Sequence, residues 1–161
     1  MKKPAKNDAH LIAPDAYPQM LGEQGAAHAL RTLRSAQTAA KAQVAMEAAI
    51  PPMRAAILQY VKEMEDAAGD LPIMFEKIHE IRGFAETAGL ATTGRIAEIL
   101  YRYRDDMERI GRPLDMTIVA LHVSAIARAA RTEEDDAGMG EVVAAELAAL
   151  VARRLAGCEQ L

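Results

Sequence analysis

One of the four histidines, His79, occurs in a pattern of residue types that could support chemistry on the surface of a helix. In the surrounding segment, apolar side chains recur with a 4-3-4-3 spacing and predict one buried stripe, made of Met74, Ile78, Ile81, Ala85 and Ala88. At about 100° per residue, His79 lies roughly 140° from the centre of this stripe, and Gly83 lies roughly opposite it. We therefore expect His79 to face solvent, with bare surface one turn further on.

Two residues near His79 in the sequence could assist a reaction at its imidazole. Arg82 can bring a positive charge to the same patch, and Phe75, one turn before His79, could restrict the rotamers of the ring and add apolar contact to a docking surface. Taken alone, a phenylalanine at this position is more often an aromatic at the edge of the core than a docking residue. A glycine inside a helix costs about 1 kcal/mol relative to alanine, and the close approach of a partner to the imidazole would be a reason for Gly83.

The same segment resembles the histidine-containing phosphotransfer (HPt) family. The family motif is His, an apolar residue at +2, a basic residue at +3, Gly at +4, a small residue near +7 and Gly at +10. The matching positions are His79, Ile81, Arg82, Gly83 and Gly89, and Leu90 continues the match. A looser similarity in helix order and spacing covers about residues 53 to 131.

The resemblance implies a phosphoryl carrier with no turnover of its own, and therefore not an enzyme. An imidazole nitrogen is a nucleophile near neutral pH, because the pKa of the side chain is about 6.5. His79 would accept the phosphoryl group of a receiver-domain aspartate and later return it, with Arg82 as a cation and Gly83 as open docking surface. The partner would be a response-regulator receiver domain or a hybrid histidine kinase. Mg²⁺ would be bound by the receiver, so that this chain needs no cofactor.

Glu86 departs from the motif, because it places a negative charge on the face of His79 where a small residue is usual. This leaves a second interpretation open, in which a degenerate HPt-like bundle binds a receiver or kinase and regulates it without carrying phosphate. In a third, the chain is a structural module that dimerises through its N-terminal helix, and His79 is incidental.

Other candidate sites have less support. His122 lies among apolar residues of a predicted helix and has no Arg-Gly pair after it, so we expect a half-buried residue. Glu76 and His79 have the Glu-x-x-His spacing of di-iron bundles, but Val119 stands three residues before His122 where a second copy would need a carboxylate. We expect no metal site.

Composition limits the class of protein. The 161 residues are 51% hydrophobic and only 4% aromatic, which favours close-packed helices and one main core. The net charge of −4 argues against a protein built chiefly to bind nucleic acid. The single cysteine fits a reducing compartment, and we find neither a secretory signal nor a stretch of about 20 apolar residues that could span a membrane. We expect a cytoplasmic protein.

The expected architecture is all-α, a four-helix bundle of the HPt type with an extra long N-terminal helix and a C-terminal helix. Residues 1–22 are predicted to form a mobile tail, residues 23–50 a long helix that Pro51-Pro52 ends, and residues 51–161 the bundle with the C-terminal helix. The four bundle helices are expected at about 53–68, 71–88, 92–110 and 114–131. The last of these should bury Ile118, Leu121, Ala125 and Ala129. The protein is expected to be either a monomer or a homodimer that forms through the N-terminal helix.

Overall fold

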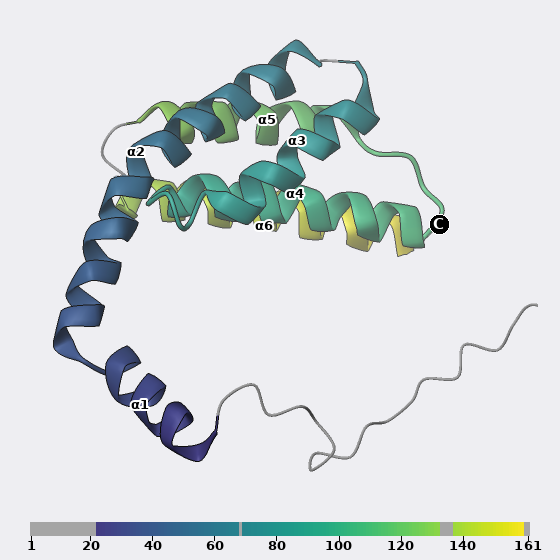
Figure 1. The fold of residues 1–161 in the computed structure, drawn as a ribbon. Coiled ribbons are helices and arrows are strands. Elements are labelled where there is room, and N and C mark those ends of the chain that lie inside the picture. The colour runs from purple at the N-terminus through teal and green to yellow at the C-terminus, as the bar shows by residue number, and fades with distance from the viewer. Residues whose placement is uncertain (1–21, 68, 133–136, 160–161) are drawn as a thin grey trace, which may run out of the picture. The chain divides into compact units, whose positions relative to one another are not determined.

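A computed structural model describes residues 22–67, 69–132 and 137–159 of the chain. All regular structure in these residues is helical, which confirms the all-α class (Figure 1). The six helices are α1 (Glu23–Leu33), α2 (Ala36–Asp66), α3 (Leu71–Phe84), α4 (Ala91–Arg109), α5 (Met116–Arg131) and α6 (Ala137–Glu159). None of them combines the length and the apolar character that a crossing of the bilayer requires. The tail predicted for residues 1–22 lies outside the described residues except for Gly22.

The helix predicted for residues 23–50 is wrong at both its interior and its end. A break at Arg34 and Ser35 separates α1 from α2, and the Ser35 hydroxyl accepts a hydrogen bond from the backbone N–H of Thr38 at 3.2 Å, as a residue that caps the start of a helix does. Pro51 and Pro52 lie inside α2. Proline removes a backbone donor but its fixed φ is helical, and the tertiary packing of the following turns stabilises the continued helix.

The chain divides into two compact units, Met1–Val44 and Ala45–Leu161, and the boundary lies within α2. In the first unit, the large apolar side chains of Leu30, Leu33 and Val44 each expose more than half of their surface. The second unit holds the core and begins a little before the bundle boundary expected at residue 51.

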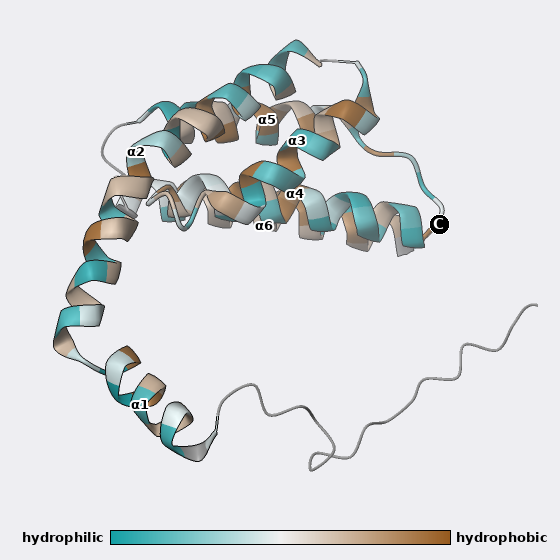
Figure 2. Ribbon diagram, in the orientation of Figure 1, coloured by the Kyte–Doolittle hydropathy of each residue, from teal (hydrophilic) through white to brown (hydrophobic). Residues whose placement is uncertain are grey.

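Helix α4 is the centre of the second unit, because α3, α5 and α6 all pack against it. Hydrophobic and hydrophilic residues alternate along these helices, as amphipathic helices require (Figure 2). The C-terminal half of α2 adds Ile57, Val61 and Met64 to the core, and α6 adds Ala144, Leu147 and Val151. The C-terminal helix is therefore an integral part of the packed bundle.

The buried face of α5 differs from the predicted one. Ile118 is buried as expected and Ala125 and Ala129 are half-buried, but Leu121 is 48% exposed. The buried positions include Val119, His122, Ile126, Ala127 and Ala130. Apolar residues occur on most sides of this helix, so that its contacts with α4 and α6, and not its own periodicity, determine which face is covered.

Candidate functional site

The start of α3 fixes the rotation of the helix that carries His79. The carboxylate of Asp70 accepts a hydrogen bond from the backbone N–H of Ile73 at 3.2 Å, and Pro72 occupies the first turn, where its missing donor has no cost. All five residues of the predicted stripe are buried, from Met74 to Ala88. His79 is exposed, as predicted.

Gly83 faces open space. A Cβ atom built at this position would meet no atom of the described residues within 4 Å. The predicted bare surface one turn after His79 is thus present, and a partner that occupies it remains a prediction.

The end of the His79 segment is fixed by a glycine and by an arginine from α2. Gly89 has a φ of +73°, and the N–H groups of Gly89 and Leu90 donate to the carbonyls of Glu86 and Ala85 in the two hydrogen bonds of a Schellman turn. Nε of Arg54 donates to the carbonyl oxygen of Ala88 at 2.9 Å. Helix α3 itself ends at Phe84 with Ala85 as its C-cap, four residues before the end expected at residue 88, and Gly89 closes the turn that follows it.

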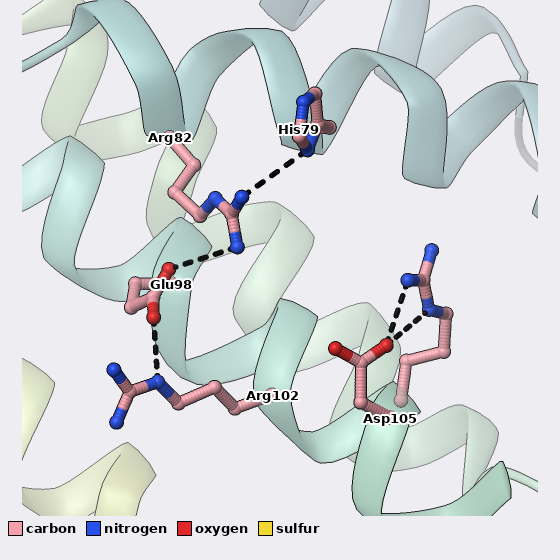
Figure 3. Close-up of polar contacts among 6 residues, drawn as sticks. His79, Arg82, Glu98, Arg102 and Asp105 are labelled. Carbon is pink, nitrogen blue, oxygen red and sulfur yellow. Dashed lines mark hydrogen bonds and ion pairs between the residues drawn. The ribbon is translucent and has the colours of Figure 1, made fainter. Parts of the chain in front are cut away.

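Arg82 lies beside the imidazole and joins it to α4 (Figure 3). Its Nη2 is 3.3 Å from Nδ1 of His79, and its Nη1 is 3.2 Å from Oε2 of Glu98. The other carboxylate oxygen of Glu98 accepts from Nε of Arg102 at 2.5 Å. A continuous chain of polar contacts, from Arg102 through Glu98 and Arg82 to His79, therefore crosses from α4 to α3.

Tyr101 packs among the charged groups of this chain. Its ring centroid is 5.5 Å from that of His79, and the guanidinium carbons of Arg82 and Arg104 lie 4.3 Å and 4.0 Å from it. Such distances are typical of cation–π contacts. Although burial opposes it, hydrogen bonds to Asp105 and Tyr101 raise the pKa of Arg104.

Phe75 does not supply the expected docking surface. Only 4% of it is exposed, and the Arg104 guanidinium covers its ring at 5.1 Å from the centroid. Its side chain turns into the core because it follows the buried Met74 and lies one turn before the buried Ile78. The interpretation of Phe75 as an aromatic at the edge of the core is the one that the burial supports.

Glu86 is exposed and lines a surface hollow that adjoins Arg82, the neighbour of His79. Arg82, Arg95, Glu98 and Glu141 line the same hollow. Arg95 pairs with Glu141, and Arg82 pairs with Glu98, so that both arginines of the hollow already have acidic partners.

The other described histidines lack this setting. His122 is fully buried, more than expected, and its Nδ1–H donates to the carbonyl oxygen of Ile118 at 2.8 Å. Burial lowers the pKa of His122. His28 is exposed on α1, and His10 lies outside the described residues.

Sequence reasoning missed Glu98 and Tyr101 as neighbours of His79. The available signal was their position on the helix after the motif, within the mixed-charge stretch that also carries Arg102 and Arg104. In the part of the chain that the structure describes, no three histidine, cysteine, aspartate or glutamate side chains are grouped so as to hold a metal ion. Comparisons with protein families, with curated proteins and with solved structures gave no match.

Proposed function

We propose that this protein is a histidine phosphotransfer carrier, which relays a phosphoryl group between receiver-domain aspartates of a two-component phosphorelay in the cytoplasm. The observation that carries the proposal is the exposed His79 with a cation, Arg82, at its ring and open surface at Gly83. In this proposal the HPt bundle consists of α2 from about residue 53, α3, α4 and α5, while α1 and α6 are additions.

The chemistry needs little from this chain. The ring of His79 attacks the phosphorus of an aspartyl phosphate on the receiver, the oxygen–phosphorus bond breaks, and the aspartate leaves as a carboxylate. The receiver supplies Mg²⁺ and a lysine. Arg82 supplies positive charge to the phosphoryl oxygens, since such transfers depend mainly on position and on charge neutralisation.

The surface around His79 suits the approach of another protein. Gly83 leaves space for its backbone, the exposed Glu86 lines the adjoining hollow, and the exposed Arg102 donates to Glu98, which lines the same hollow. Charges at the edge of such an interface determine partner choice more than affinity.

The test is phosphate exchange with purified receiver domains that carry ³²P. We expect label on this protein that is lost in acid and retained in alkali, as a phosphohistidine requires. His79→Gln should abolish the label and change the free energy of unfolding by less than about 0.5 kcal/mol, because the side chain is exposed. His28→Gln, an exposed histidine on α1, is the matched control and should label normally. Label that survives His79→Gln but not His122→Gln would contradict the proposal.

A second candidate function is a degenerate HPt-like bundle that binds a receiver or kinase and regulates it without carrying phosphate. The specific observation in its favour is that Arg82 is already paired with Glu98, and that Glu86 and Glu141 add negative charge to the adjoining hollow. Binding of a phosphorylated receiver without any transfer of label to His79 would support this candidate over the first.

A further inference from the structure

The contact between Arg82 and His79 determines which nitrogen of the neutral ring carries the proton. A guanidinium has hydrogen-bond donors only, so Nδ1 of His79 must accept the bond from Nη2 of Arg82. A neutral imidazole has one N–H, which in this arrangement is on Nε2. Neither nitrogen can then attack phosphorus, because Nε2 carries the proton and the lone pair of Nδ1 is directed at Arg82.

Arg82 is restrained in this position by α4. Glu98 attracts it at 3.2 Å, Tyr101 lies under its guanidinium at 4.3 Å, and only 30% of its side chain is exposed. Glu98 is in turn held by Arg102 at 2.5 Å. The carboxylate of Glu98 thus orients Arg82 so that one amino group faces the acid and the other faces Nδ1 (Figure 3).

We infer that Glu98 is a positioning residue, which holds Arg82 against Nδ1 and thereby keeps the proton of His79 on Nε2. Arg82 must leave Nδ1 before the ring accepts a phosphoryl group. The phosphoryl step of this inference rests on the proposed function, whereas the tautomer that it assigns to the ring does not.

Once Arg82 has moved, the ring can react. Solvent carries the proton from Nε2 to Nδ1, which frees the lone pair of Nε2. This pair forms the nitrogen–phosphorus bond, the oxygen–phosphorus bond of the aspartyl phosphate breaks, and its electrons leave with the carboxylate. The proton on Nδ1 stays on the ring, and Arg82 can donate to the new phosphoryl oxygens.

The tautomer is measured directly by ¹⁵N NMR of the full chain labelled in its histidine rings, at about pH 8.5, where an ordinary imidazole is neutral. The His79 signals are identified by their loss in His79→Gln. We expect the wild-type ring to be protonated on Nε2, and the ratio of Nδ1–H to Nε2–H to rise about three- to tenfold in Glu98→Gln, the range that one hydrogen bond produces. Arg82→Met should shift the ratio in the same direction. Glu108→Gln, an exposed acid on the same helix, should match wild type.

A wild-type ring protonated mainly on Nδ1, or an equal ratio in wild type and Glu98→Gln, would overturn the inference. The second readout is labelling of His79 by phosphoramidate, a small donor that needs no docking and that loses ammonia as its nitrogen–phosphorus bond breaks. Glu98→Gln should label about threefold faster than wild type or more, because both the lone pair and Arg82 are released. Equal rates despite a shifted tautomer would refute the requirement that Arg82 must leave. A shifted tautomer with no label on any protein would retain the positioning role and contradict the proposed function.

Discussion

The side chain of Arg54 donates from Nε to the carbonyl oxygen of Ala88, and so connects α2 to the turn that ends the His79 segment. A Cβ atom at Gly89 would lie 3.1 Å from Nη2 of the same arginine. The first prediction tests this link. Arg54→Met should lower the free energy of unfolding by about 1 kcal/mol, the usual net value of one hydrogen bond, in urea unfolding. Labelling of His79 by phosphoramidate should persist, because the contacts of the ring with Arg82 and Tyr101 remain. A variant as stable as wild type would mean that the link contributes nothing.

A substitution at Gly83 should affect the docking of a receiver without affecting the chemistry at His79. Gly83→Leu should block transfer from a phosphorylated receiver, since the side chain would fill the open surface on which the proposed receiver docks, while phosphoramidate should still label His79. Stability should rise by up to about 1 kcal/mol in thermal or urea unfolding, because leucine favours the helix more than glycine does. Gly83→Ala is the control, because alanine favours the helix at least as much as leucine does but adds only one methyl group to the surface. Undiminished transfer with leucine present would mean that no partner approaches Gly83.

The orientation of α3 could be predicted from sequence because the predicted stripe, from Met74 to Ala88, recurs at helical spacing and is the stripe that the fold buries. Because Met74, Ile78 and Ile81 are buried on one face of the helix, His79 must lie on the face exposed to solvent. The buried face of α5 was predicted less well. The exposed face of α5 carries Leu121, and tertiary contacts chose between its two apolar sides.

Contacts between side chains of different helices could not be predicted from the sequence. Nothing in the spacing of α3 indicates that Glu98 of the next helix holds Arg82, because this depends on the rotation of both helices. The continuation of α2 through Pro51 and Pro52 is similar, since residues after the prolines, such as Ile57, stabilise the helix by packing into the core.

Burial of His122 predicts a loss of stability in acid. Because burial lowers the pKa of His122 below its ordinary 6.5, the unfolded chain binds the proton more readily than the folded one. The contribution of His122 is therefore complete above pH 6.5 and is lost as the pH falls below that value, until the folded pKa is passed. The Nε2 atom has no hydrogen-bond partner within the described residues, so nothing there compensates a charge on the ring.

The measurement is urea unfolding of wild type and His122→Asn at several pH values from 7.5 to 5. The Asn amide can donate to the carbonyl oxygen of Ile118 as Nδ1–H does, but it does not titrate. We expect the free energy of unfolding to fall more steeply with acid in wild type than in the variant. Parallel curves would show that protonation of His122 has no part in the pH dependence.

Glu86 is the departure from the HPt pattern, and it gives the last prediction. It is exposed beside Arg82, at the edge of the surface that a receiver would cover. If it pairs with a cation on the cognate receiver, Glu86→Ala should slow transfer from that receiver and leave the others unchanged. If it repels the phosphoryl group, the same variant should speed transfer from many receivers. We favour pairing, because Arg82 is available for the phosphoryl group once it leaves Nδ1 of His79, whereas Glu86 on the rim can meet a cation of the partner.

Transfer rates with a panel of receivers, for wild type and Glu86→Ala, distinguish these outcomes. Measurements at low and high salt should show the difference between the two proteins shrinking as salt rises, because exposed charges are screened. Glu76→Ala is a matched control, since Glu76 is an exposed acid on α3 outside the hollow that Glu86 lines. Phosphoramidate labelling should be nearly equal in wild type and Glu86→Ala under pairing, and faster in Glu86→Ala under repulsion. Identical receiver rates throughout would place Glu86 outside the interface and contradict both versions.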